Sequence, residues 1–275
     1  MKTIGFVVLT WNSDKVIERC LDSLLNMKSK VLLPAVVVID NGSKDDTVKL
    51  VKKAFERKPD INTKLISLTK NMGTTYSRNL GILHMKNNQV NYVCILDSDT
   101  EIDAFAMESL IDVLDKNEGC GIVGPRMHDS KMVYQQSGRQ IPTLTEKLFK
   151  VVPIKSIQQK GIAKQATISE TGVGSVNVGY LMSACWVMRT SIFDQVGFLD
   201  EKIFYAPEDV DYCIRCWKNG LSVKYCYDAD IVHEWQRLSR KKILSKHNIE
   251  HVKGLAYMFL KHKYLFNADR FMKER

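Results

Sequence analysis

The first 125 residues alternate between short apolar runs and longer segments whose apolar residues recur at helical spacing. Runs of apolar residues at 4–10 and 35–40 are typical of strands buried on both faces, and 64–68 and 92–97 are predicted as a third and a fourth strand. Each of these four strands is followed by a segment with helical periodicity, at residues 14–27, 44–57, 74–85 and 104–116. A short strand is predicted after the last of these, at 121–123. This β-α-β order predicts an α/β fold with a mostly parallel central sheet flanked by helices.

The rest of the chain is patterned less regularly. Residues 140–174 lose the periodicity and collect prolines and glycines, which predicts a long loop or lid. We expect a helix over 207–219 and one or two amphipathic basic helices over 238–262. The apolar stripe of the last segment consists of Leu244, Ile249, Val252, Leu255, Ala256, Phe259 and Leu260. A helical C-terminal extension is therefore predicted.

Polar clusters stand at the ends of three predicted strands. They are Thr10-Trp11-Asn12, Asp40-Asn41-Gly42 and Asp97-Ser98-Asp99. Ligands of parallel sheets bind beyond the carboxyl ends of the strands, which meet at one edge. The three clusters therefore predict a binding site at that edge.

The strongest of these clusters contains Asp97 and Asp99, two residues apart in the chain. In an extended segment this spacing directs both carboxylates to one side, where they can hold a hard divalent cation and, through it, a diphosphate. The alternative is that Ser98 and Glu101 form a capping box for the following helix. The position after the fourth strand favours the metal site.

Two further groups could carry chemistry in the second half. Glu208 and Asp209 could supply a general base, although acids are also ordinary in the first turn of a helix. Asp211 and Arg215 have the spacing of a supporting ion pair on that helix. His233 could complete a metal site through an imidazole nitrogen, or it could be a structural histidine among aromatic residues.

Weaker signals lie elsewhere. Asn71 and Gly73 predict a turn just before the helix that carries Arg78. Anions bind favourably at such a helix N-terminus. The alternative is a capped helix with an exposed arginine. Asp40 could bind a base or ribose, or simply stabilise a turn. A zinc site of Cys213, Cys216, Cys226 and His233 is disfavoured because the first two cysteines fall inside a predicted helix.

Charge is distributed unevenly along the chain. Apolar residues make up 45% and charged residues 26%, an ordinary globular balance, with a net charge of +9. Residues 235–275 hold eleven basic and three acidic side chains, so this tail carries +8 and the body is nearly neutral. Such a tail suits an anionic membrane surface or an anionic acceptor. The alternative is a solvated basic helix pair packed on the body, and a homodimer through the apolar stripe is also permitted.

Several classes of protein are disfavoured. The first strand is not followed by G-x-G-x-x-G, and the chain contains neither a P-loop nor a G-x-S-x-G elbow. The neutral body argues against a nucleic-acid partner. A strand-like run at the N-terminus and no apolar stretch of about 18–20 residues predict a cytoplasmic protein with reduced cysteines, at most peripheral on the inner face of the cell membrane.

Taken in order, these motifs resemble the family 2 inverting glycosyltransferases of the GT-A fold, and most of all their bacterial rhamnosyltransferase-like and galactofuranosyltransferase-like members. The residues that carry the resemblance are Val7–Asn12, Val38–Ser43, Asn71-Met72-Gly73, Arg78–Ile82, Asp97-Ser98-Asp99 and Glu208–Asp211 with Arg215. The resemblance implies a GT-A domain over residues 1–235, with a nucleotide-binding half (1–125), an acceptor half (126–235) and a basic extension (236–275).

The resemblance also implies a role for each matching residue. The nucleotide would be bound by Thr10, Trp11, Asn12, Asp40, Asn71, Arg78, Asp97 and Ser98. Asp99, with Asp97 and His233, would hold Mg²⁺ or Mn²⁺ on the diphosphate. Asp209 would be the catalytic base with Glu208 as its neighbour, and Asp200 and Glu201 would lie near the acceptor.

The expected activity is therefore inverting transfer of a sugar from a UDP- or dTDP-linked donor to a hydroxyl of a glycan, lipid-linked or protein acceptor, in bacterial polysaccharide or glycoconjugate synthesis. Thr74–Ser77 departs from the usual small residues of the family. Trp235–Leu238 does not match the Q-x-x-R-W motif of processive members, which argues against a polysaccharide synthase. A non-catalytic nucleotide-sugar-binding subunit of a larger assembly remains the alternative.

Overall fold

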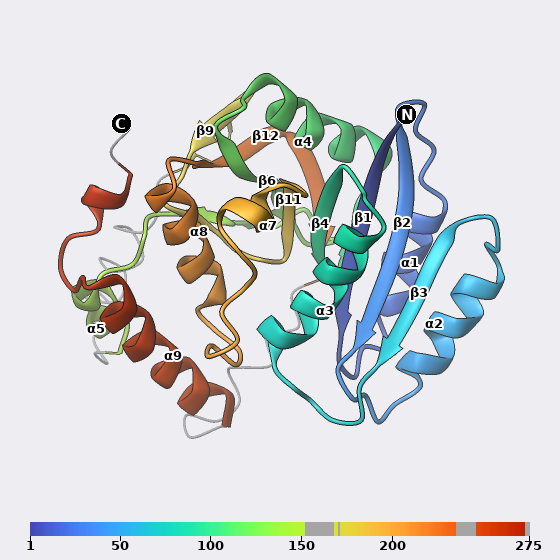
Figure 1. The fold of residues 1–275 in the computed structure, drawn as a ribbon, viewed down its shortest axis with the longest axis horizontal. Helices are drawn as coiled ribbons and strands as arrows, with labels where there is room; N and C mark the ends of the chain where they lie inside the picture. Colours follow the sequence, from blue (N-terminus) through green and yellow to red (C-terminus); the bar gives the residue numbers. More distant parts are fainter. Residues whose placement is uncertain (152–167, 170, 235–245, 273–275) are drawn as a thin grey trace.

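A computed structural model describes residues 1–151, 168–169, 171–234 and 246–272. Its centre is a mixed sheet in the order β3-β2-β1-β4-β11-β6-β12-β5, with helices on both faces (Figure 1). Strands β1, β2, β3 and β4 pair in parallel, whereas β11 inserts antiparallel between β4 and β6. The predicted α/β class is confirmed, and the strands of the first half are mostly parallel.

The elements of the first half follow the predicted order. The strands are β1 (Lys2–Thr10), β2 (Leu32–Asp40), β3 (Asn62–Ser67), β4 (Tyr92–Asp97) and β5 (Thr100–Glu101). The helices are α1 (Ile17–Leu25), α2 (Thr47–Glu56), α3 (Thr74–Asn87) and α4 (Ala104–Lys116). Two helices begin three residues later than predicted. Before α2, the Asp45 carboxylate accepts hydrogen bonds from Thr47 N and Oγ1, which holds that segment in a turn.

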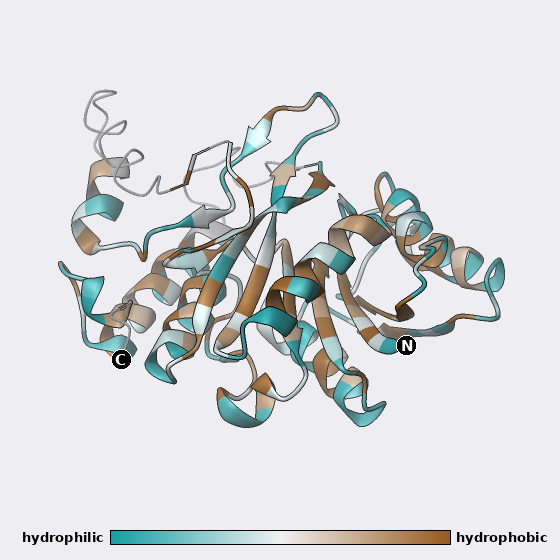
Figure 2. Cartoon of the chain, turned by 90° about the horizontal axis from the view of Figure 1, so that it is seen from above, coloured by the Kyte–Doolittle hydropathy of each residue, from teal (hydrophilic) through white to brown (hydrophobic). Residues whose placement is uncertain are grey.

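Burial on both faces explains the continuous apolar runs. In β1, Val7 faces the core beneath α3, whereas Phe6 and Val8 face the core beneath α1 and α4. Figure 2 shows hydrophobic colours along the central strands and hydrophilic colours on the outer turns of the flanking helices. Strands β1, β2 and β4 therefore carry no polar face, whereas the edge strand β3 is partly exposed along its length.

The second half is more irregular. Its strands are β6 (Cys120–His128), β7 (Tyr134–Gln135), β8 (Gly138–Arg139), β9 (Ser175–Asn177), β10 (Tyr180–Leu181), β11 (Cys185–Arg189) and β12 (Ser222–His233). Its helical elements are α5 (Leu144–Val151), α7 (Ile192–Gln195), α8 (Glu208–Lys218), α9 (Lys246–His262) and a 3₁₀ turn, η2 (Asp269–Phe271). The predicted pair of Asp211 and Arg215 is confirmed on α8, at 3.1 Å.

The prediction that residues 140–174 form a long loop is wrong in part, because this segment contains α5. The start of α5 has a capping box. Thr143 N donates to Glu146 Oε2, and Glu146 N donates to Thr143 Oγ1. A threonine followed three residues later by a glutamate is a recognisable helix start, so the sequence held a signal for this helix. Residues 152–167 and 170 of the same segment lie outside the described residues.

The described part of the C-terminal extension packs on the rest of the fold. Met258 and Phe259 of α9 are buried in the same core as Tyr212 of α8. The ring of His262 lies 2.8 Å from the carboxylate of Asp211, and both side chains are buried. Residues 236–245 lie outside the described part of the chain. The expected boundary at residue 235 therefore does not divide two cores.

Two expectations concern the whole chain. The seven cysteines are free and buried, as expected of reduced thiols, and Cys213 and Cys216 lie on α8 inside the core. Within the ranges that the structure describes, none of the helices has the length and apolarity to cross a bilayer.

Candidate active site

A cavity of about 360 Å³ opens at the carboxyl ends of β1 and β4 and at the start of α8. Nine of the predicted site residues line it: Trp11, Asn71, Arg78, Asp97, Ser98, Asp99, Glu208, Asp209 and His233. These residues span 223 positions of sequence yet meet at one edge of the sheet, as the topology rule predicts.

The metal edge of this cavity consists of Asp97, Asp99 and His233, whose candidate ligand atoms all lie within 4.8 Å of one another. Pairing of β12 with β5 brings them together, because His233 stands opposite Thr100 in the register. Asp99 Oδ1 lies 3.5 Å from His233 Nε2. Two carboxylates and an imidazole suit Mg²⁺ or Mn²⁺.

The capping-box alternative for this cluster is wrong. The N-cap of α4 is Asp103, whose side chain accepts a hydrogen bond from Ala106 N at 2.8 Å. The carboxylates of Asp97 and Asp99 line the cavity instead and are not used to cap α4.

Gln135 of β7 orients His233, and the sequence analysis missed it. Its amide Nε2 donates to His233 O at 2.7 Å, so its Oε1 faces His233 Nδ1 at 2.8 Å. Nδ1 therefore carries a hydrogen, and Nε2 is the nitrogen turned toward Asp99. Burial lowers the pKa of His233, but hydrogen bonding to Asp99 and the charges of Asp99 and Asp97 outweigh it and raise the pKa overall. The raised pKa favours a second hydrogen on Nε2, and a bound cation would displace it.

Arg78 joins the metal edge to the opposite side of the cavity. Its guanidinium donates to Asp97 Oδ1 at 2.6 Å and to Glu208 Oε1 at 3.0 Å, and its side chain is 2% exposed. Ser183 Oγ accepts from Arg78 at 2.8 Å and donates to Glu208 at 2.9 Å. The alternative of an exposed arginine is wrong. Arg78 supports two carboxylates from beneath the cavity.

The base edge consists of Glu208 and Asp209 in the first turn of α8. Burial and the neighbouring Asp209 charge raise the pKa of Glu208 from 4.5 to about 7, against the opposing effect of Arg78. Burial also raises the pKa of Asp209, while the Val210 amide and the positive charges of Lys147 and Arg139 oppose the rise. A carboxylate with a raised pKa that faces a cavity is suited to accept a proton near neutral pH.

The loops around the cavity are tied together by amide side chains and by close backbone packing. Asn41 donates to Asn71 Oδ1 at 3.1 Å and accepts from Met72 N at 2.8 Å. Gly73 has a φ of +92°, and a Cβ there would lie 2.5 Å from Phe204 O. Only glycine fits this contact without displacing the backbone. The turn before α3 therefore sits directly against the loop that precedes α8.

Three residues predicted to bind nucleotide shape the loops behind the cavity. Asp40 is buried, and its carboxylate accepts from Ser43 N at 3.2 Å. The side-chain oxygen of Asn12 accepts from Lys44 N at 2.8 Å, and the backbone N of Asn12 donates to Ser43 Oγ. Thr10 is also buried. Direct contact of these three residues with a nucleotide stays a prediction.

The structure places Asp200 and Glu201 away from the cavity lining. Asp200 accepts from Tyr257 at 2.9 Å and from Lys261 at 2.6 Å, both on α9. Glu201 accepts from Asn79 at 2.9 Å. In this arrangement both acids link elements of the protein, and their predicted proximity to an acceptor stays a prediction.

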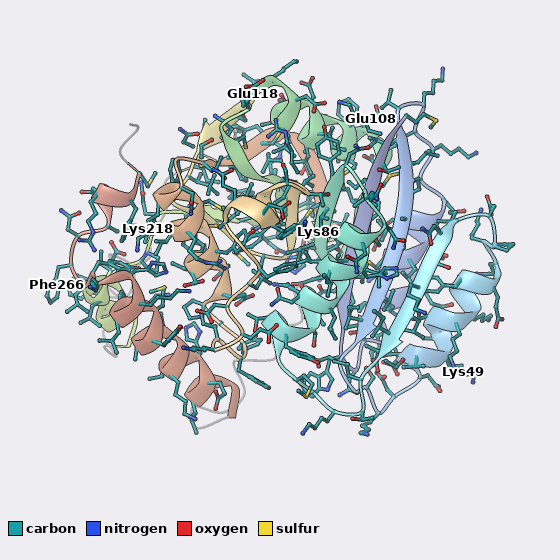
Figure 3. All side chains as sticks on the ribbon, viewed as in Figure 1. Lys49, Lys86, Glu108, Glu118, Lys218 and Phe266 are labelled. Atoms are coloured by element: carbon teal, nitrogen blue, oxygen red, sulfur yellow. The ribbon has the colours of Figure 1, made fainter. Side chains whose placement is uncertain are left out.

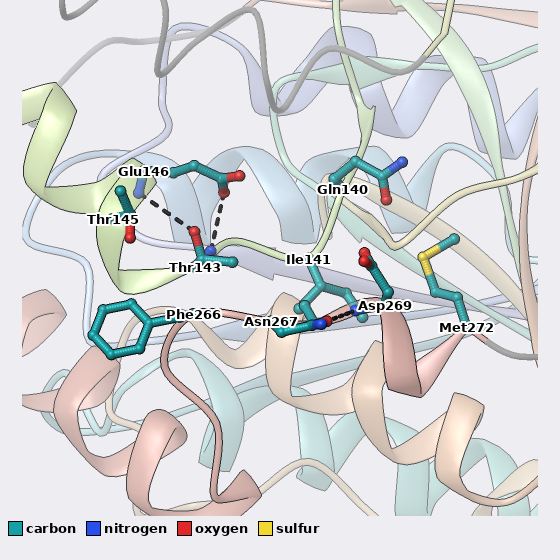
Figure 4. A pocket seen from close by; sticks show the side chains of 10 residues that line it. Gln140, Ile141, Thr143, Thr145, Glu146, Phe266, Asn267, Asp269 and Met272 are labelled. Carbon is teal, nitrogen blue, oxygen red and sulfur yellow. Dashed lines mark hydrogen bonds between the residues drawn. The ribbon is translucent and has the colours of Figure 1, made fainter.

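A second cavity of about 400 Å³ lies between the start of α5 and the segment that follows α9 (Figure 4). The hydrogen bonds at its rim are the capping box of Thr143 and Glu146 and a turn in which Asn267 accepts from Asp269 N. These bonds hold the local fold. Size alone therefore does not identify the functional cavity, whereas the chemistry of the lining does.

Comparison with known proteins agrees with this geometry. The model of "Glycosyl transferase family 2" matches residues 6–197. The chain is 25% identical over 270 residues to the N-acetylglucosaminyl-diphospho-decaprenol L-rhamnosyltransferase of Mycobacterium tuberculosis, covering 96% of this chain and 83% of that protein. It is also 25% identical over 198 residues to the dTDP-rhamnosyl transferase RfbF of Shigella flexneri, covering 72% and 59% of the two chains.

Two solved structures share the fold. One is GalNAc-T7 with UDP, GalNAc and Mn²⁺, with a TM-score of 0.69 at 13% identity, covering 94% of this chain and 48% of that one. The other is the Pyrobaculum calidifontis mannosyltransferase PcManGT with GDP-Man and Mn²⁺, with a TM-score of 0.62 at 16% identity, covering 98% and 66%. This chain has a GT-A fold and belongs to the family 2 glycosyltransferases, with rhamnosyltransferases among its relatives.

Proposed function

We propose that this protein transfers a sugar from a nucleoside diphosphate donor to an acceptor hydroxyl by direct displacement with inversion. The observation that carries the proposal is that one cavity holds both a metal-ligand group, Asp97, Asp99 and His233, and a half-buried carboxylate with a raised pKa, Asp209. The first group suits a leaving diphosphate, and the second suits an attacking hydroxyl.

The metal edge would hold Mg²⁺ or Mn²⁺. When bound, the cation neutralises charge that develops on the leaving diphosphate. Asp99 Oδ1 lies 3.5 Å from His233 Nε2, and Gln135 keeps that nitrogen turned toward Asp99. Asp97 shares its carboxylate with Arg78, so one of its oxygens is already engaged.

Asp209 would act as the general base. As the acceptor oxygen bonds to the anomeric carbon, the bond from that carbon to the diphosphate oxygen breaks, and the hydroxyl proton passes to Asp209. Val210 N donates to Asp209 Oδ1 at 2.8 Å, which leaves the other carboxylate oxygen for the acceptor. Glu208 is bound by Arg78 and Ser183, so its role is to position the arginine.

We propose a dTDP- or UDP-linked deoxyhexose as the donor and a lipid-linked diphosphate as the acceptor, as in the names of the rhamnosyltransferase relatives. Two half-buried cations near Asp209 support an anionic acceptor. They are Arg139 and Lys147. Both act on the pKa of Asp209, and burial lowers the pKa of Lys147. An acceptor phosphate would neutralise them. Such an acceptor places the enzyme in the cytoplasm at the inner face of the cell membrane.

Transfer by the purified protein tests the proposal. A panel of nucleotide sugars with Mn²⁺ should yield donor hydrolysis or transfer with one nucleotide, and Asp209→Asn should reduce the rate about 10²–10⁴-fold. Asp60→Asn, at an exposed acid outside the cavity, is the matched control and should retain the rate. Near-normal transfer by Asp209→Asn would remove the assigned base. Donor binding without hydrolysis or transfer would favour the non-catalytic subunit instead.

A further inference from the structure

Helix α9 presents an apolar stripe to solvent. Ile249 is 46% exposed, Val252 64% and Leu260 77%. Exposed Lys253, Ala256 and Lys263 lie on the same side, because these positions follow one another at intervals of three and four residues. Beyond the helix, Leu265 is 45% exposed and Phe266, which also lines the cavity beside α5, is 69% exposed. Figure 3 shows Phe266 at the outer edge of the molecule, far from Lys49 on α2.

The opposite side of α9 is fully used in folding. Met258 and Phe259 are buried in the core. Tyr257 and Lys261 bind Asp200, and His262 binds Asp211. The exposed stripe is therefore not required to hold the helix on the body. Contiguous apolar residues on such a surface mark an interaction site.

The charge of this region identifies the partner. Residues 235–275 carry a net charge of +8, whereas the rest of the chain is nearly neutral. On the stripe itself, Lys253 and Lys263 alternate with the apolar residues, and the acid beside them, Glu250, is paired with Lys253 at 2.9 Å. Apolar anchors interleaved with lysines are typical of helices that lie in the interface of an anionic bilayer.

Helix α9 packs directly against the loop that lines the catalytic cavity. A Cβ at Gly254 would lie 2.1 Å from Ala206 O, so α9 touches the loop that lines the cavity next to Glu208. Asp200, which precedes that loop, is held by α9 through Tyr257 and Lys261. A surface that binds α9 therefore lies close to the acceptor side of the cavity.

We infer that this face of α9, with Leu265 and Phe266, docks the enzyme in the interface of a bilayer that contains anionic lipids. Docking there brings the cavity to the plane in which a lipid-linked diphosphate carries its head group. Only the reason given for docking, proximity to a lipid-linked acceptor, rests on the proposed function. The docking itself is measured as membrane binding, without any donor or acceptor.

Vesicle sedimentation with the full chain tests the inference. The protein should bind vesicles of phosphatidylcholine and phosphatidylglycerol, should bind phosphatidylcholine alone much more weakly, and should be released by salt. Leu260→Ser with Phe266→Ser should reduce the partition coefficient at least about tenfold, because two apolar anchors are lost. Phe105→Ser, at a site 70% exposed on α4, is the matched control and should leave binding unchanged.

The electrostatic part is tested separately. Lys253→Gln should weaken binding to the anionic vesicles by about fivefold, whereas Lys49→Gln on α2 should not. Equal binding by the double serine variant and the unchanged chain would overturn the inference. So would a dimer in light scattering that the same double variant dissociates, since the stripe would then bind a second copy.

The two proposals fail separately. The double variant should keep its rate of donor hydrolysis in solution, because the substituted side chains lie outside the cavity. Vesicle binding without turnover of any donor would contradict the proposed activity and leave the docking surface intact. Turnover without vesicle binding would do the reverse.

Discussion

The metal edge and the base edge of the cavity are built in different ways. Hydrogen bonds between strands place Asp97, Asp99 and His233. Asp97 is the last residue of β4, and the pairing of β12 with β5 brings His233 beside Asp99. Glu208 and Asp209 are placed by side chains from distant segments. Arg78 reaches Glu208 across 130 positions of sequence, and the loop before them packs on Gly73 and Gly254.

This difference shows where the structure should tolerate change. Strand register is specified by many hydrogen bonds, so substitution of one ligand on the metal edge should leave the fold intact and remove function. The base edge depends on a few buried polar contacts, so the loss of one of them should affect both stability and activity.

The largest effect is expected at the metal edge. Asp99→Asn keeps the shape of the side chain but removes a charged ligand, so activity with Mn²⁺ should fall by about 10³-fold, as expected when several kcal/mol of charge stabilisation is lost. The urea midpoint should fall only slightly, because the contact that is lost is the one with His233 at 3.5 Å and not an ion pair of the Arg78 network. A rate similar to that of the unchanged chain would show that Asp99 does not bind the cation.

Arg78 is the residue through which the two edges meet, and its removal should reduce stability. Arg78→Met leaves Glu208 without its buried cation, so the free energy of unfolding should fall by about 3–5 kcal/mol in urea titrations. Arg57→Met removes an exposed pair with Asp22 and should cost about 1 kcal/mol or less. Equal losses for the two variants would show that the buried network contributes no more than a surface pair.

A smaller effect is expected behind the metal edge. Gln135→Leu removes the acceptor that turns His233 Nε2 toward Asp99, so the affinity for Mn²⁺ should fall about 10–100-fold. Calorimetric titration of Mn²⁺ measures it. Gln136→Leu, at the neighbouring residue, is the control, since its backbone carbonyl and not its side chain accepts from Arg139. Unchanged affinity in the first variant would exclude His233 as a ligand.

The same difference between the edges explains what the sequence could predict. The strands of the first half and their polar ends were predictable, because two-sided burial produces continuous apolar runs and parallel strands end at one edge. Asp99 follows from such an end, whereas His233 is assigned through the family resemblance. Gln135 and Ser183 were missed because they lie beside short or irregular strands, whose pairing depends on distant segments.

The base edge shows the limit more clearly. An arginine on a helix with polar neighbours predicts an exposed side chain, and only the packing of α3 against α8 and the 182–184 segment buries Arg78. The position of Asp200 also depends on α9, which is formed by residues far along the chain. In contrast, α5 could have been predicted from Thr143 and Glu146, because a capping box is a local signal.

The smallest predicted effect is a shift in pH dependence that originates at the base edge. Asp209 must be ionised to accept a proton, and burial raises its pKa, so kcat/KM should rise with pH along an acid limb that lies above the range of an ordinary aspartate. In Glu208→Gln, the amide oxygen can still accept from Arg78 and Ser183, but the neighbouring negative charge is gone. Asp209 should then ionise more easily, and the acid limb of the profile should move to lower pH.

Stability should respond to the same substitution with a definite sign. The pKa of Glu208 rises from 4.5 to about 7 on folding, so the folded state holds more protons than the unfolded state between these values. The contribution of this group is present below the lower value and is lost as the pH rises through the upper one. Urea midpoints of the unchanged chain should therefore decline between these two pH values relative to those of Glu208→Gln, whose glutamine at position 208 does not titrate. Parallel profiles for the two proteins would mean that Glu208 stays ionised beside Arg78, and the acid limb of kcat/KM would then belong to Asp209 alone.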